Sequence, residues 1–229
     1  ARSTQAITNQ TVLFGRATIP LLYGLARHLG TRREALLAAA LLAVSYHHIW
    51  FSQNARGYTA LSFFALATTW AIIRGFEEER PAFFLLYGLA AGLGVYTHLT
   101  FVFTVVAQFL VAVMAVVGIP RGRKRVEWKG PLLAFSTGAA VTLLLYAPML
   151  VQVVDFFLNQ PSNLVGHSSP LWALQEGLRV LGLGLAAGSG IGALVLVAGA
   201  AVGVAGLVSI ARQDPRIVLL LVFLPPGPA

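Results

Sequence analysis

Apolar residues form long runs along most of the chain, and short polar segments separate these runs. A helix needs about 20 apolar residues to cross a bilayer core of about 30 Å, because each helical residue adds about 1.5 Å. Most of the runs approach this length, so they predict membrane-spanning helices. The predicted helices cover residues 11–29, 35–51, 58–73, 82–96, 99–118 and 131–154.

The connections between the runs complete the predicted topology. Only Thr97 and His98 separate the fourth run from the fifth, which predicts a tight helical hairpin, since unpaired backbone is not stable in lipid. The region 178–211 is long for one span and short for two, and we favour one span over about 190–211. A last run begins at Ile217. The pattern predicts an all-α fold, a polytopic transmembrane helix bundle of about seven spans plus a truncated one.

The composition is that of a protein surrounded by lipid. Hydrophobic residues make up 57% of the chain and charged residues only 10%, whereas a soluble domain carries about 25% charged residues. The net charge of +8 does not indicate nucleic acid as a partner, because the cations lie between apolar runs. Residues 1–229 are therefore expected to form a single transmembrane domain. We expect this domain to belong to a longer protein, because the chain lacks an initiator Met and stops after an unfinished apolar run.

Basic residues concentrate in alternate connections, and cytoplasmic loops of membrane proteins carry the excess of Lys and Arg. The pattern predicts an integral, multi-pass protein, which we place in the plasma membrane of a prokaryote rather than in the endoplasmic reticulum. The predicted cytoplasmic side holds twelve of the sixteen Lys and Arg residues: Arg27, Arg32, Arg33, Arg74, Arg80, Arg121, Arg123, Lys124, Arg125, Lys129, Arg212 and Arg216.

The opposite side carries few charges but many polar side chains, and the segment Ser52-Gln-Asn-Ala-Arg-Gly-Tyr58 is the strongest local signal. Ser52 is placed to N-cap the next helix, whose free N–H groups attract anions. Arg56 would then lie in the first turn, where the helix dipole disfavours a cation unless it meets an anion such as phosphate. The alternative is an Arg that extends to water.

Further candidates lie on the same side. Gln53 is a candidate sugar or phosphate contact or else makes a loop hydrogen bond, and His98 is a candidate phosphate contact or else a satisfied hairpin histidine. His47 and His48 are adjacent and point apart near a helix end, so they do not indicate a metal site. Arg16 is either a second phosphate contact or a side chain that extends to water. Asp155 is either a general base or an interfacial cap.

Residues 17–108 resemble a known family, the polytopic glycosyltransferases of the protein O-mannosyltransferase and aminoarabinose-transferase type, which have the GT-C fold. The segment 52–58 carries most of this resemblance. The other matching segments are Thr18-Ile-Pro-Leu-Leu-Tyr-Gly-Leu-Ala-Arg27, Arg33-Glu-Ala-Leu-Leu-Ala-Ala39 and Gly92-Leu-Gly-Val-Tyr-Thr-His98.

The resemblance implies transfer of a hexose or pentose from a polyprenyl- or dolichyl-phosphate carrier to an acceptor on the outer face. Arg56 and Tyr58 match the family's Arg and Tyr, and Gln53, His98 and Ser52 would line the carrier site. The family's catalytic acid lies in an outer loop before its second span, so we expect it upstream of residue 1 and leave the catalytic residues unknown. No cofactor is implied, and neither the sugar nor the acceptor is identified.

Two other functions compete with this interpretation. A transporter or lipid flippase needs ionisable groups inside its spans, and Arg16 is the main candidate that this sequence offers. A non-catalytic membrane subunit would leave the polar residues of the outer side unexplained.

Overall fold

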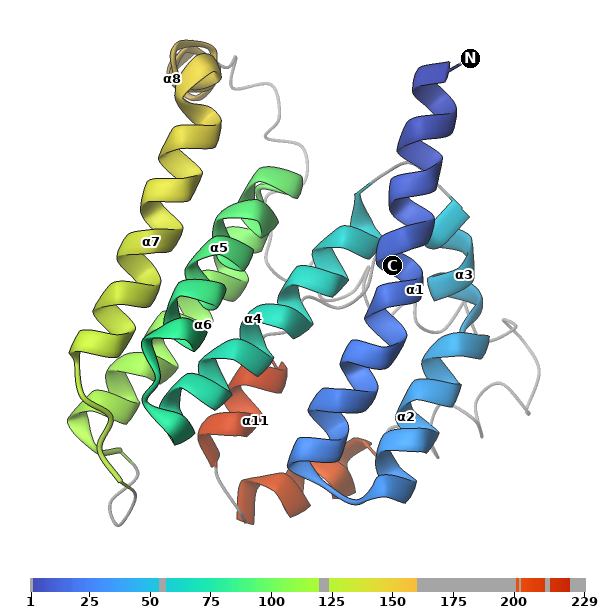
Figure 1. The fold of residues 1–229 in the computed structure, drawn as a ribbon, viewed down its shortest axis with the longest axis vertical. Coiled ribbons are helices and arrows are strands. Elements are labelled where there is room, and N and C mark those ends of the chain that lie inside the picture. The colour runs from blue at the N-terminus through green and yellow to red at the C-terminus, as the bar shows by residue number, and fades with distance from the viewer. Residues whose placement is uncertain are drawn as a thin grey trace. The chain divides into compact units, whose positions relative to one another are not determined.

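A computed structural model of the protein describes residues 2–53, 57–119, 124–159, 201, 203–212 and 215–222. The regular structure in these residues is helical throughout, so the all-α prediction is confirmed (Figure 1). The chain divides into unit 1, Ala1–Tyr146 with Asp214–Pro228, and unit 2, Ala147–Gln213 with Ala229. A single transmembrane domain stays a prediction.

Unit 1 contains most of the helices expected from the apolar runs. Its long helices follow one another with short connections, and α11 packs against α6 (Figure 1). The helices are α1 Arg2–Leu29, α2 Arg32–Val44, α3 Tyr46–Gln53, α4 Tyr58–Glu78, α5 Pro81–Thr97, α6 Phe101–Val117, α7 Lys129–Tyr146 and α11 Pro215–Val222.

Two predicted helices are interrupted. The run 35–51 forms α2 and α3, which are bent by 54° to each other, because Ser45 adopts an extended conformation with φ −64° and ψ 119°. The run 131–154 forms α7, the 3-10 turn η1 Ala147–Met149 and α8 Leu150–Asn159 of unit 2. Of region 178–211, only residue 201 and residues from 203 onward are described, so the number of crossings there stays a prediction.

The described helices fit a membrane bundle by length and composition. Tyr58–Glu78 and Lys129–Gln152 are each long and apolar enough to cross a bilayer, and the bent pair α2–α3 is a third candidate. The helices α5 and α6 have 17 residues each, which is the lower limit for a span. Their connection of three residues, 98–100, confirms the predicted tight hairpin.

Close packing of α5 against α7 depends on small residues. A Cβ atom on Gly88 would lie 2.5 Å from Thr137 Cβ and 2.7 Å from Ala134 O. A Cβ atom on Gly92 would lie 2.5 Å from Val141 Cγ1. The GxxxG spacing of Gly88 and Gly92 therefore lets the two backbones approach, as in other membrane helix pairs.

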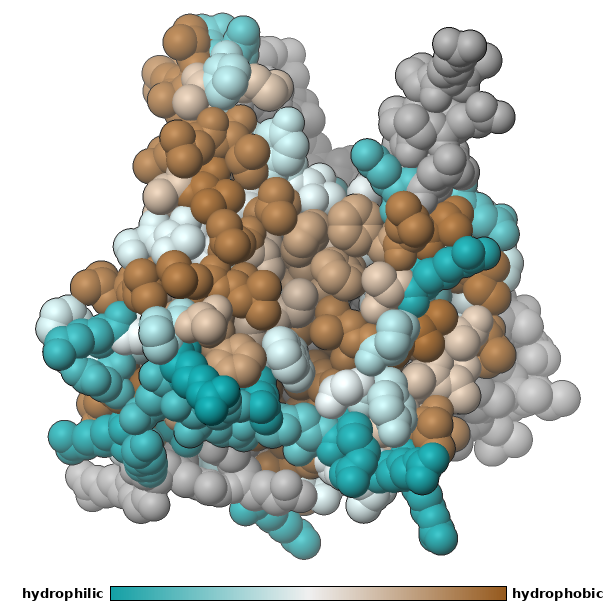
Figure 2. Space-filling model, viewed as in Figure 1, coloured by the Kyte–Doolittle hydropathy of each residue, from teal (hydrophilic) through white to brown (hydrophobic). Residues whose placement is uncertain are grey.

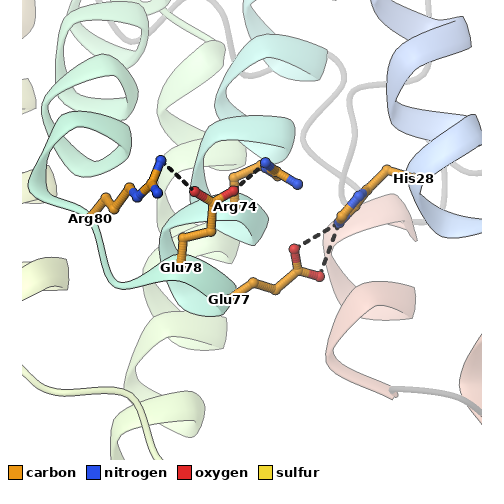
Figure 3. A network of polar contacts seen from close by, with 5 residues as sticks. All are labelled: His28, Arg74, Glu77, Glu78 and Arg80. Carbon is orange, nitrogen blue, oxygen red and sulfur yellow. Dashed lines mark hydrogen bonds and ion pairs between the residues drawn. The ribbon is translucent and has the colours of Figure 1, made fainter.

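Charged residues gather at one end of unit 1, where α1, α4 and α6 end and α2, α5 and α7 begin (Figure 2). We call it the basic end. Glu77 pairs with His28 of α1 at 2.8 Å, and Glu79 pairs with Lys124 at 3.1 Å. Glu78 pairs with Arg74 and with Arg80 (Figure 3). Three of the basic residues that the sequence assigns to one side, Arg74, Arg80 and Lys124, thus pair with glutamates at the C-terminal end of α4.

Candidate functional site

The opposite end of unit 1 brings together an aromatic residue and a histidine from the predicted site. Tyr58 is the first residue of α4, and His98 follows the last residue of α5. Their ring centroids lie 5.4 Å apart, with 31° between the ring planes. Phe51 of α3 packs edge-on against Tyr58, with the centroids 5.2 Å apart. We call Phe51, Tyr58 and His98 the aromatic–histidine cluster.

Gly57 sets the position of Tyr58. It is the N-cap residue of α4 and has φ +73°, in the left-handed region that glycine adopts without a steric cost. A Cβ atom at this position would lie 3.5 Å from Thr97 O, an ordinary contact distance. The requirement for glycine here is therefore conformational. The left-handed turn starts α4 beside the end of α5, which brings Tyr58 next to His98.

His98 is held in one orientation by the residue two positions further on. The Thr100 backbone N–H donates to His98 Nδ1 at 3.4 Å, and Thr100 Oγ1 lies 2.7 Å from the same atom. Because Nδ1 accepts a hydrogen bond, the proton of the neutral ring lies on Nε2. The Nε2–H group has no acceptor among the described residues and remains a donor for a ligand. Sequence reasoning missed Thr100, although its spacing from His98 was a usable signal.

Ser52 has a structural role that differs from the predicted one. It lies inside α3, where Ser52 Oγ donates to His48 O at 2.6 Å. The cap of α4 is Gly57, with no side-chain hydrogen bond, so the prediction that Ser52 caps this helix is wrong. Because α4 begins at Tyr58, its first turn does not include residue 56 either. Ser52 packs instead against α1, since a Cβ atom on Gly15 would lie 2.2 Å from Ser52 Oγ.

The remaining site predictions are only partly tested. Arg56 lies outside the described residues, so its role stays a prediction. Gln53 is the exposed last residue of α3. His48 is a satisfied structural histidine, because His48 Nε2 lies 3.0 Å from Gly15 O. No cluster of three or more metal-ligating side chains is present in the part of the chain that the structure describes.

The described carboxylates of unit 1 lie away from the aromatic–histidine cluster. All five are at the basic end: Glu34, Glu77, Glu78, Glu79 and Glu127. Asp155 belongs to α8 of unit 2, where it accepts a hydrogen bond from Asn159. The described part of unit 1 therefore offers hydrogen-bond donors and aromatic rings near His98, and no carboxylate.

An apolar cavity of about 370 Å³ opens close to the cluster, between α5, α6 and α7. Val95, one turn before His98, and Val102, one position into α6, line its near end. The hydroxyl of Tyr146 donates to Val95 O at 3.2 Å, beside this end. The other lining residues are Tyr87, Ala91, Val105, Phe135, Gly138, Ala139, Thr142 and Leu143.

The helices and their apolar surface define a polytopic helical membrane protein, with a histidine donor one helical turn from Val95 of an apolar cavity. Residues 1–152 match the model of one protein family, described as dolichyl-phosphate-mannose-protein mannosyltransferase. The match covers more than half of the chain, so the chain belongs to this family of membrane glycosyltransferases. Searches of curated proteins and of solved structures gave no match. The suspected resemblance is confirmed at the level of the family.

Proposed function

We propose that this chain binds the lipid-linked sugar donor of a membrane glycosyltransferase, with the carrier phosphate at the aromatic–histidine cluster. The donor is a polyprenyl- or dolichyl-phosphate sugar, and the acceptor receives the sugar on the side opposite the basic end. The observation that carries the proposal is the Nε2–H donor of His98, which has no acceptor among the described residues and which the contact between Nδ1 and Thr100 holds in place.

The chemistry of the cluster suits a phosphate monoanion or dianion. A neutral imidazole with its proton on Nε2 donates one hydrogen bond to a phosphate oxygen, and hydrogen bonds to charged groups contribute about 1.5–3 kcal/mol. Tyr58 supplies a ring against the imidazole and a hydroxyl nearby. Arg56 precedes Tyr58 by two residues, and we assign it to the same phosphate on the basis of the sequence.

The apolar cavity gives the carrier chain a path. Val95 and Val102 begin the cavity about one helical turn from His98, so a phosphate at the cluster places the first isoprene units against these valines. The chain then continues between α6 and α7 toward Phe135. Neutralisation of the leaving phosphate by fixed donors is the expected contribution to the reaction, because such donors stabilise developing negative charge without reorganisation.

Binding of undecaprenyl phosphate and of dolichyl phosphate to the full chain in detergent tests the proposal. The variant His98→Phe keeps a ring against Tyr58 and removes the donor. It is expected to weaken binding of the phosphates about tenfold. Arg56→Ala is expected to weaken binding at least as much. His47→Phe is the matched control, because His47 packs against Tyr46 and not in the cluster.

The corresponding prenyl alcohol separates a phosphate contact from a lipid contact. Its affinity should be the same in the unmodified chain and in His98→Phe, since the alcohol carries no charge. If His98→Phe binds both phosphates as tightly as His47→Phe does, the cluster does not hold the phosphate and the proposal is wrong.

A further inference from the structure

A second apolar cavity lies at the basic end of unit 1, between the last turns of α6 and the first turns of α7. Its volume is about 270 Å³. Val113 and Val117 form its α6 side, Leu132 its α7 side, and Trp128 closes it toward the basic end. These four side chains are between 43% and 58% exposed, so the cavity is an open groove on the apolar surface.

Arg125 lies next to the α6 end of this groove and has no anionic partner among the described residues. Its side chain covers Gly118, the residue after Val117, because a Cβ atom on Gly118 would lie 2.7 Å from Arg125 Nε and 2.9 Å from Arg125 Cγ. The neighbouring cations differ from it in this respect. Lys124 pairs with Glu79 at 3.1 Å, and Lys129 pairs with Glu127 at 2.9 Å.

Two further features favour a lipid headgroup at this position. Trp128 is exposed, and its indole N–H has no acceptor among the described residues; tryptophan is enriched where membranes meet water. The carbonyl oxygen of Ala115, in the last turn of α6, already accepts a hydrogen bond from the Val126 N–H at 3.2 Å. Arg125 is therefore not needed as a hydrogen-bond donor to this carbonyl group.

We infer that the groove between α6 and α7 binds one anionic phospholipid, with its phosphate at Arg125 and Trp128 and an acyl chain along Val117 and Val113. Guanidinium groups bind phosphate in a bidentate manner, and basic residues next to a membrane attract anionic lipids. The site is separate from the proposed carrier site, because Phe135 stands between the two cavities. Its ring contacts Tyr87 at 5.0 Å on one side and Phe109 at 5.2 Å on the other.

Quenching of Trp128 fluorescence by brominated lipids tests this inference in the full chain. A triple variant leaves Trp128 as the only tryptophan of the chain; it combines Trp50→Phe, Trp70→Phe and Trp172→Phe. Vesicles contain phosphatidylglycerol or phosphatidylcholine with bromine on the acyl chains. Half-maximal quenching by brominated phosphatidylglycerol is expected at a lipid fraction about fivefold lower than for brominated phosphatidylcholine. A fivefold preference is the effect expected from one basic residue at the membrane surface.

The matched variants are Arg125→Gln and Arg33→Gln, both of exposed arginines at the basic end. Arg125→Gln should abolish the preference for phosphatidylglycerol and leave quenching by phosphatidylcholine unchanged, whereas Arg33→Gln should retain the preference. Equal quenching by the two lipids in the single-tryptophan chain without an arginine substitution would overturn the inference. An equal loss of the phosphatidylglycerol preference in Arg125→Gln and Arg33→Gln would also overturn it. If the single-tryptophan chain does not fold, native mass spectrometry of the chain with all four tryptophans tests the same inference. It compares the phosphatidylglycerol that remains bound to Arg125→Gln with the amount bound to Arg33→Gln.

Discussion

The contact between α5 and α7 makes a quantitative prediction about one glycine. In the variant Gly88→Ala the new methyl group would meet Thr137 Cβ at 2.5 Å and the backbone oxygen of Ala134 at 2.7 Å, whereas ordinary contacts begin near 3.4 Å. A backbone oxygen cannot rotate away, so the two helices must separate by about 1 Å, which forfeits a quarter to a half of the dispersion energy of each facing atom pair.

The magnitude follows from two opposing terms. Overpacking of this kind costs about 1–3 kcal/mol, while Ala is favoured over Gly inside a helix by about 1 kcal/mol. The matched control is Gly24→Ala in α1, where a Cβ atom would meet nothing within 4 Å. Gly24→Ala should therefore increase the free energy of unfolding by up to about 1 kcal/mol. The two variants should differ by about 1–3 kcal/mol, because only the steric term separates them.

Unfolding by sodium dodecyl sulfate in mixed micelles, followed by tryptophan fluorescence, measures this difference in the full chain. Gly92→Ala should fall between the two variants, since the nearest backbone atom, Gly138 O, would lie 3.3 Å from its methyl group, compared with 2.7 Å for Ala134 O in Gly88→Ala. The packing argument is refuted if Gly88→Ala is as stable as Gly24→Ala.

Four other variants can be measured in the same assay. Tyr87→Phe removes a buried hydroxyl that has no hydrogen-bond partner in the described part of the chain and should raise the free energy of unfolding by about 1 kcal/mol. Tyr146→Phe loses the bond to Val95 O and should lower the free energy of unfolding by about as much. Thr31→Ala removes one half of the capping box of α2 and should cost about 1 kcal/mol. Glu78→Gln should cost less than about 1 kcal/mol, because its partners are partly or largely exposed; a larger loss would contradict this view of the basic end.

Helix positions could be predicted from the sequence because hydrophobic length is a strong signal in a membrane protein. The runs at 58–73, 82–96 and 99–118 correspond to α4, α5 and α6 within a few residues at most ends. The break at Ser45 could not be predicted in the same way. It lies between the apolar residues Val44 and Tyr46 and follows from the backbone angles of one residue, which leave no mark on the hydropathy pattern.

The site was predictable in its residue types and not in its geometry. Tyr58 and His98 are 40 positions apart in the sequence, and only the left-handed Gly57 turn and the short hairpin after α5 make them neighbours. A serine before a helix is a common N-cap, so Ser52 was assigned that role. The structure uses glycine instead, because the helix starts five residues later.

The close packing at Gly88 and Gly92 was not predicted from the sequence, although the spacing is visible there. The GxxxG spacing of Gly88 and Gly92 is present in the sequence but is surrounded by larger apolar residues. Only the distances from Gly88 to Thr137 and from Gly92 to Val141 show that this pair packs closely against α7.

The two ends of unit 1 differ in whether their hydrogen-bond donors already have acceptors, and this difference bears on where a ligand binds. At the basic end Glu77, Glu78 and Glu79 pair with His28, Arg74, Arg80 and Lys124, so an incoming anion competes with a carboxylate for these groups. The Nε2–H donor of His98 has no such competitor among the described residues, and Thr100 already fixes the ring. Binding an anion there requires little ordering of the site, and a pre-ordered donor retains more of its interaction energy as affinity. The same reasoning separates Arg125 from the paired lysines beside it, because a lipid phosphate reaches its guanidinium without breaking an ion pair.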